Sequence, residues 1–156
     1  MSVKYDHLLG RTFIPGVRDC FELGIELYWD NFQIKITPYA RPQDWSADNF
    51  DLIRRLHDRE GFNMITDWKV GDLRPADVLA VAIGESNPNH LAYYVGDNMI
   101  IHHLGGRFSE AEIFRDFWRN STCFILRHPS VPDLRPVHDN TDVGGILRDR
   151  YNRISA

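Results

Sequence analysis

The stretch that decides the fold is residues 16–29, Gly-Val-Arg-Asp-Cys-Phe-Glu-Leu-Gly-Ile-Glu-Leu-Tyr-Trp. Asp19 followed three positions later by Glu22 is typical of a helix N-terminus, where the Asp carboxylate accepts a hydrogen bond from an otherwise unpaired backbone N–H. Cys20 would then be the first helical residue. Unpaired N–H groups and the helix dipole at that position favour the thiolate, which is the nucleophilic form of cysteine. The stretch therefore predicts a buried helix that begins at a nucleophilic thiol.

Two plainer interpretations of this stretch stay open. Apolar residues alternate from Phe21 to Leu27 as they would in a strand, although the cap and the Leu and Glu content favour a helix. A cysteine among apolar neighbours is also more often a small core residue than a nucleophile. The catalytic interpretation of Cys20 therefore needs a base elsewhere in the chain.

Length, charge and cysteine content exclude several classes of protein. A chain of 156 residues suits one domain that buries roughly 70% of its unfolded surface without disulfides or a metal. A net charge of −4 without a basic block disfavours binding to nucleic acid or to an anionic membrane. We expect no signal peptide and no membrane anchor, because no apolar run has the required length. Cys20 and Cys123 make no disulfide framework, so we expect both to be reduced.

The first half of the chain predicts helices and one loop. We expect a short helical turn over residues 5–10 and a loop with at most one short edge strand over residues 31–41. A second, amphipathic helix is expected over residues 45–61. Pro38 and Pro42 interrupt any strand in the loop. Phe50 and Leu56 fall on one face of the second helix, whereas His57 is expected to be half-exposed.

The second half predicts an antiparallel sheet and one more helix. Strands are expected at 63–68, 78–83, 90–95, 99–103 and 122–127. Ser109 and Glu112 repeat the capping-box pattern and predict a helix that ends near Trp118. Cys123 lies in an apolar strand and is expected in the core. The fold class is therefore α+β, with an antiparallel sheet of about five or six strands and the Cys20 helix packed on it.

The last residues differ in composition from the rest of the chain. Residues 130–156 are rich in Pro, Asp, Arg and Asn and show no sustained apolar period. We therefore expect one domain over residues 1–129 and a C-terminal extension over 130–156 that binds a partner or stays loose.

A hairpin offers the base that the thiol needs. A thiolate nucleophile requires a base within hydrogen-bond reach and a third group that orients the base. Gly96-Asp97-Asn98 between two apolar segments is a strong hairpin signal. A three-residue loop places His90 and His102 on one face of the sheet, whereas a two-residue loop would select His103. We expect the three-residue loop, with His103 facing away from Cys20 as a surface residue.

Three motifs resemble a known family. They are Gly-x-x-Asp-Cys-x-x-Leu from residue 16, Leu-x-Pro-x-Asp-Val-Leu at 73–79, and the segment from His90 to His102. Together they resemble the NlpC-type family of papain-like peptidoglycan cysteine peptidases, over roughly residues 8–129. The resemblance implies that Cys20 is the nucleophile, His90 the base and His102 the orienting residue. It also implies cleavage of peptidoglycan stem peptides, typically at the D-glutamyl to diaminopimelate bond.

Further features resemble the phage branch of this family. Leu-Leu-Gly-Arg at 8–11 and the long excursion after the helix are similar to tail-tip assembly proteins of long-tailed phages. This implies other tail-tip proteins as partners, and a location in the virion tail tip or the cytoplasm of the infected host. Many bacterial members have a Tyr in the approach loop that can help the oxyanion hole, where this chain has Phe13. Loss of one such donor typically costs ~10²- to 10³-fold in rate.

The leading hypothesis is a phage tail-tip cysteine peptidase that works through an acyl-enzyme. The alternative is a structural tail-tip assembly protein with a weak or silent peptidase site. An acyltransferase of the related lipid-modifying kind usually needs a membrane anchor, which we do not expect here. No cofactor is expected. A metal site built from Cys20, His90, His102 and His103 is disfavoured, since the sequence has neither His-Glu-x-x-His nor Cys-x-x-Cys.

Overall fold

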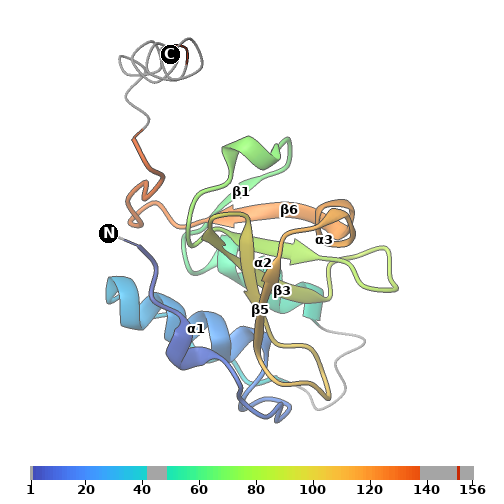
Figure 1. The fold of residues 1–156 in the computed structure, drawn as a ribbon. Helices are drawn as coiled ribbons and strands as arrows, with labels where there is room; N and C mark the ends of the chain where they lie inside the picture. Colours follow the sequence, from blue (N-terminus) through green and yellow to red (C-terminus); the bar gives the residue numbers. More distant parts are fainter. Residues whose placement is uncertain (1, 42–48, 138–150, 152–156) are drawn as a thin grey trace.

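The chain forms one antiparallel six-stranded sheet with helices on both faces (Figure 1). The structure is a computed structural model that describes residues 2–41, 49–137 and 151. The strands are β1 Asn63–Ile65, β2 Val78–Val81, β3 His90–Gly96, β4 Met99–His102, β5 Glu110–Ile113 and β6 Thr122–Arg127, in the spatial order β1-β6-β2-β3-β4-β5. The helical elements are η1 Asp6–Leu8, α1 Cys20–Phe32, α2 Asn49–Asp58, η2 Val70–Asp72 and α3 Asp116–Ser121. The α+β fold class and the antiparallel sheet are confirmed.

The sheet separates two apolar layers. Side chains alternate along a strand, so Val78 and Leu79 of β2 point to opposite faces. Val78 belongs to the layer shared with α1 and α2, and Leu79 to the layer that contains Trp118 of α3. All four residues of β2 are buried, as the apolar run predicted. In the described part of the chain, no helix is long and apolar enough to cross a membrane.

A buried ion pair fixes the start of α1. The Asp19 carboxylate accepts hydrogen bonds from the backbone N–H of Glu22 (2.9 Å) and of Gly16 (3.0 Å), which confirms the predicted cap. The Arg41 guanidinium donates to the same carboxylate at 2.6 Å and to the Gly16 carbonyl at 2.9 Å. The side chains of Asp19 and Arg41 are 0% and 3% exposed. The approach loop, the helix and the excursion that follows it are therefore joined at one carboxylate.

Helix α1 approaches β3 very closely through a glycine. The Tyr93 hydroxyl donates to the Cys20 carbonyl at 2.5 Å, so one hydrogen bond joins the strand to the first residue of the helix. A Cβ added at Gly24 would lie 2.2 Å from that hydroxyl oxygen. Only a residue without a side chain allows this approach. The glycine in the middle of a helix, which costs intrinsic helix stability, is explained by the contact.

The predicted loop and second helix are confirmed in part. Residues 33–41 form a loop without a strand, which agrees with the expected loop. The expected helix opening at 45–48 lies outside the described residues, and α2 is described from Asn49. Leu56 of α2 is buried and Phe50 is partly buried, as the amphipathic pattern predicted, and Leu52 and Ile53 are buried beside them. His57 is exposed rather than half-exposed.

The helix predicted from Ser109 and Glu112 is wrong. Residues 110–113 form β5, which pairs with β4 at the edge of the sheet. The Ser109 hydroxyl accepts from the backbone N–H of Arg11 and donates to the Leu8 carbonyl, so it ties the strand to the N-terminal segment and caps no helix. Sheet pairing and this long-range bond outweigh a local pattern that is compatible with either structure.

The hairpin reaches the expected register by a different turn. Asp97 and Asn98 both have positive φ, 52° and 58°, as in a two-residue type I′ turn, so the predicted three-residue loop is wrong. The pairing shifts by one residue between Tyr94 and Gly96, and this bulge compensates for the shorter loop. Ala92 consequently lies opposite His102, which places His90 and His102 on the same face.

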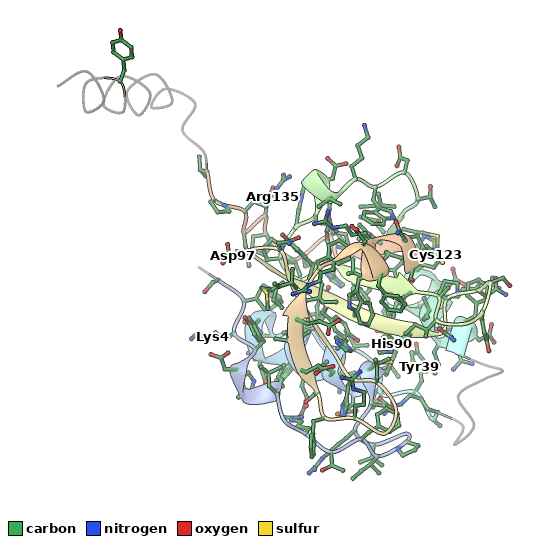
Figure 2. The ribbon with its side chains drawn as sticks, turned by 45° about the vertical axis from the view of Figure 1, so that its right-hand side comes forward. Lys4, Tyr39, His90, Asp97, Cys123 and Arg135 are labelled. Atoms are coloured by element: carbon green, nitrogen blue, oxygen red, sulfur yellow. The ribbon has the colours of Figure 1, made fainter. Side chains whose placement is uncertain are left out.

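A second shift in the sheet decides the position of Cys123. In the pairing of β2 with β6, Ala80 lies opposite Phe124 and the next residue, Val81, lies opposite Thr122. Cys123 lies between these two partners as the unpaired residue of a bulge. Cys123 is exposed, so the expectation of a core cysteine is wrong (Figure 2). Both cysteines are free, as predicted.

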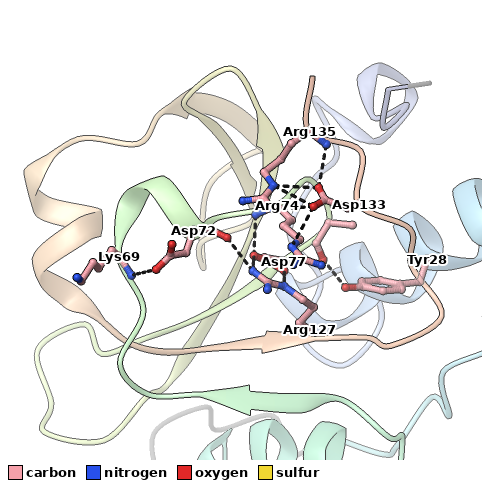
Figure 3. Close-up of polar contacts among 9 residues, drawn as sticks. Tyr28, Lys69, Asp72, Arg74, Asp77, Arg127, Asp133 and Arg135 are labelled. Carbon is pink, nitrogen blue, oxygen red and sulfur yellow. Dashed lines mark hydrogen bonds and ion pairs between the residues drawn. The ribbon is translucent and has the colours of Figure 1, made fainter. Parts of the chain in front are cut away.

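Ion pairs hold the end of β6 and the segment after it (Figure 3). Arg127 donates to both carboxylate oxygens of the buried Asp77, at 2.8 Å each. Arg74 lies 3.5 Å from Asp133, which also binds Arg135. Part of the expected extension is therefore attached to the domain at Asp133, and the boundary at 129–130 stays a prediction.

The Gly24 contact gives a test of the fold. We expect Gly24→Ala to lower the free energy of unfolding by ~1 to 3 kcal/mol, because the added methyl group overlaps the ring and hydroxyl of Tyr93. Gly71→Ala is the control, since a Cβ there meets nothing within 4 Å. Urea denaturation of both variants measures the difference. A Gly24→Ala protein as stable as Gly71→Ala would contradict the described docking of α1 on β3.

Candidate active site

Cys20 lies at the N-terminus of α1 inside the protein. It is 2% exposed and borders a narrow cavity of about 10 Å³, which holds one water molecule at most. The cavity is lined by Cys20, Phe21, Leu52, Ile53, Asn89, His90 and Leu91. Two of these residues come from α2, so this helix covers the thiol in the described conformation.

The thiol of Cys20 is held in its protonated form. Burial, with a smaller contribution from the neighbouring Asp19 carboxylate, raises its pKa to about 12. A hydrogen bond from the Leu91 backbone and the charge of Arg41 act in the opposite direction but are weaker. The expected stabilisation of the thiolate by the helix terminus is therefore wrong for this conformation, because desolvation outweighs the helix dipole.

His90 is the first residue of β3 and borders the same cavity as Cys20. Its Nε2 atom is buried and has no hydrogen-bond partner among the described residues. Burial, with a smaller contribution from the neighbouring His102 and His103, lowers the pKa of His90 to about 3. The imidazole is therefore neutral near pH 7 and has a lone pair available for a proton.

His102 lies beside His90 on the face of the sheet that carries α3. The two rings have centroids 5.9 Å apart and are nearly perpendicular, and the Trp118 ring lies 4.5 Å from His102. Burial lowers the pKa of His102, although Glu112 and Glu110 act to raise it. Its Nε2 atom is 3.5 Å from Glu112 and 3.6 Å from Glu110. The sequence prediction missed both carboxylates, because it placed them on a helix.

His103 is not the surface residue that the sequence predicted. It is 2% exposed, its Nε2 lies 3.1 Å from the Arg107 carbonyl, and its ring contacts Phe13 edge to face at 5.2 Å. Phe13 thus supplies a packing surface in the approach loop and carries no hydroxyl that could bind an oxyanion.

Asn89 is a supporting residue that the sequence prediction missed. Its side-chain amide accepts from the backbone N–H of Ile83 and donates to the Ile83 carbonyl, both at 2.8 Å. These bonds fix the chain directly before His90. The Asn-Pro-Asn turn at 87–89 was the available signal, and it was interpreted only as a break between strands.

The structure thus brings two of the three predicted residues, Cys20 and His90, to one cavity. The third, His102, lies against His90. Their catalytic roles stay predictions. A wider hollow of about 620 Å³ lies between η2, the hairpin turn and the segment after Asp133. Cys20, His90 and His102 do not line it. It therefore has no part in the predicted chemistry.

Comparisons with known proteins agree with the fold and with the motifs. Residues 8–127 match the NlpC/P60 family. Cys20, His90 and His102 lie within the matched range. Tail tip assembly protein K of Escherichia phage lambda is 32% identical over 122 residues, which cover 78% of this chain and 59% of that protein. Tail tip assembly protein K of Escherichia phage N15 is 23% identical over 126 residues, which cover 80% of this chain and 50% of that protein.

The chain spans between half and three fifths of the length of these relatives. The family match covers more than half of the chain, and the lambda protein exceeds 30% identity over most of it. The chain belongs to the NlpC/P60 family.

Proposed function

We propose that this protein is a cysteine peptidase of a phage tail tip that cleaves peptidoglycan stem peptides at a D-glutamyl to diaminopimelate type of bond. The observation that carries the proposal is the shared cavity of Cys20 and His90, with His102 against His90, inside the region that matches the family. The names of the two phage relatives support the location in the tail and the partnership with other tail-tip proteins.

The first chemical step starts from a neutral pair. Because the Cys20 thiol is protonated and His90 is neutral, His90 accepts the thiol proton as the sulfur attacks the carbonyl carbon of the scissile bond. The backbone N–H groups at the start of α1 are oriented toward the developing oxyanion. His102 holds the His90 ring in place during the transfer.

In the second step His90 donates the proton that it has accepted. The imidazolium of His90 gives its proton to the leaving amine, and the acyl group stays on Cys20 as a thioester. His90 then accepts a proton from water as the water attacks the thioester, and it returns this proton to the Cys20 sulfur as the carbon–sulfur bond breaks. The new carboxylic acid loses its proton to solvent and leaves as a carboxylate. One histidine thus acts as base and then acid in each of the two stages, formation and hydrolysis of the thioester.

Substrate access requires a change at α2. A cavity of about 10 Å³ has no room for a peptide, and Leu52 and Ile53 of α2 line it beside the thiol. Binding of a stem peptide therefore displaces this helix from Cys20. Displacement also exposes the thiol to water, which lowers its pKa toward the ordinary value and prepares it for attack.

The burial of the thiol also favours a second candidate function. A structural assembly protein with a silent site would retain the packed α2 and the protonated Cys20 permanently. In that case the segment after Pro129, which includes the exposed Val137, serves to bind neighbouring tail proteins. Activity and thiol accessibility distinguish the two functions.

Activity on purified stem peptides tests the leading proposal. We expect Cys20→Ser to abolish hydrolysis and Cys123→Ser to leave it unchanged, because Cys123 is exposed on β6, outside the Cys20 cavity. Mass spectrometry of a muropeptide digest identifies the cleaved bond. Equal activity of the two variants at equal stability would exclude Cys20 as the nucleophile, and a wild-type protein without activity would favour the structural function.

The role of His102 is tested against its neighbour. We expect His102→Ala to lower kcat by about 10⁴-fold with a smaller effect on KM, by analogy with the loss of the orienting residue of a triad. His103→Ala is a matched control, because His103 is equally buried but contacts Phe13 and Arg107. His102→Gln should restore part of the activity. A larger loss of kcat in His103→Ala, at equal folded fraction, would assign the orienting role to His103.

Thiol labelling tests the resting conformation. We expect iodoacetamide at pH 8 to modify Cys123 at least tenfold faster than Cys20, because Cys123 is exposed whereas the Cys20 thiol is buried with a pKa of about 12. This order is the reverse of the one expected for an activated helix-terminal thiolate. Peptide mass spectrometry of the labelled protein measures both rates. Faster labelling of Cys20 in the absence of substrate would show that α2 does not cover the thiol.

A further inference from the structure

We propose that His102, Glu110 and Glu112 form a binding site for a divalent transition-metal ion, with Zn²⁺ as the best fit. The three side chains come from the neighbouring strands β4 and β5. His102 is paired directly with Glu110, and Glu112 lies two residues further along the same face. Their ligand atoms all lie within 4.8 Å of one another.

The distances are close to those of a three-ligand zinc site. Ligand atoms at bond lengths of 2.0 to 2.1 Å around a tetrahedral ion are roughly 3.3 Å apart. His102 Nε2 lies 3.5 Å from Glu112 Oε1 and 3.6 Å from Glu110 Oε1. A contraction of a few tenths of an ångström would therefore bring the imidazole into position with either carboxylate.

Burial gives an independent reason for a ligand at this place. The side chain of His102 is 1% exposed, yet neither ring nitrogen has a hydrogen-bond partner among the described residues. The Oε1 atom of Glu110 is also buried without a hydrogen bond. These atoms have charged neighbours at ion-pair distances, with Arg107 3.3 Å from Glu110 Oε1, but no hydrogen bond. Buried polar atoms without hydrogen bonds cost free energy, which a bound cation would offset.

The surroundings resemble an outer shell for the site. The Trp118 indole N–H donates to Glu112 Oε1 and orients that carboxylate, as second-shell donors do at metal sites. Arg107 lies 3.3 Å from Glu110, but its side chain is 61% exposed and can turn into solvent when a cation replaces it. The Glu110 and Glu112 side chains are 35% and 37% exposed, which leaves an entry path from solvent.

The ligand set selects the class of ion. One imidazole and two carboxylates suit Zn²⁺ and its transition-metal neighbours, whereas Mg²⁺ and Ca²⁺ prefer oxygen ligands alone. Three protein ligands leave the fourth tetrahedral position to water. The two negative charges of the carboxylates balance the charge of the ion.

Occupation of the site would inhibit the proposed peptidase, an inference that rests on the proposed function. Without a metal, the two carboxylates favour a proton on Nε2 of His102, because that atom faces them. A metal ion takes the Nε2 lone pair, so the proton of a neutral His102 moves to Nδ1. The His102 ring centroid lies 5.9 Å from that of His90, so a cation bound to His102 also disfavours the positive charge that His90 acquires during the proposed reaction.

Direct zinc binding tests the site without any assay of activity. We use a Cys20→Ser/Cys123→Ser background, which removes both thiols as competing ligands, and titrate Zn²⁺ against a chromophoric chelator. We expect one site, with at least tenfold weaker binding in Glu110→Gln and in Glu112→Gln. Glu85→Gln is the control, because Glu85 is exposed in the loop before β3. Unchanged zinc affinity in both site variants, or no binding in the parent, would overturn the site.

Inhibition is tested separately in the wild-type chain. We expect stoichiometric Zn²⁺ to abolish peptide hydrolysis and a Glu110→Gln/Glu112→Gln variant to resist it. Equal inhibition of both proteins would place the ion at the Cys20 thiol and overturn the regulatory role. A wild-type chain that binds one zinc ion but hydrolyses no peptide would contradict the proposed peptidase and support the site.

Discussion

The position of the predicted nucleophile depends on one buried ion pair, Asp19 with Arg41. The carboxylate of Asp19 joins the approach loop, the first turn of α1 and the excursion after the helix, and almost no part of either side chain reaches solvent. Removal of one partner from such a pair typically costs ~3 to 5 kcal/mol, because the other charge stays buried without compensation. Cys20 follows Asp19 directly, so the ion pair sets where the thiol lies relative to β3.

The same burial explains why the resting site is neutral. A carboxylate next to the thiol disfavours a second negative charge, and the apolar cover of α2 removes the water that would stabilise one. Burial also disfavours the charged form of His90, which lowers its pKa, so its imidazole stays uncharged. A neutral thiol beside a neutral imidazole is stable in a closed protein, and it becomes reactive when substrate replaces the cover.

The sequence predicted the features that rest on local chemistry. The cap at Asp19, the buried strand β2 and the hairpin from His90 were recognisable because short patterns determine them. Long-range contacts decided the rest. Arg41 has no local signal for its pairing with Asp19, and the exposure of Cys123 follows from a bulge against β2 that no pattern within β6 reveals. The predicted face of His102 was right although the turn was wrong, because a bulge and a shorter loop shift the register in opposite directions.

The misassigned strand β5 shows why one residue of register has chemical consequences. Pairing of Glu110 with His102 puts Glu110 and Glu112 on the face that carries the two imidazoles, and places Ala111 on the opposite face. A slip by one residue would reverse every side chain of the strand and remove both carboxylates from His102. Ser109 opposes such a slip, since its hydroxyl bonds to both Arg11 and Leu8 directly before the strand begins. The contact between β5 and the N-terminal segment, rather than the strand's own sequence, therefore determines which charged groups surround the predicted orienting histidine.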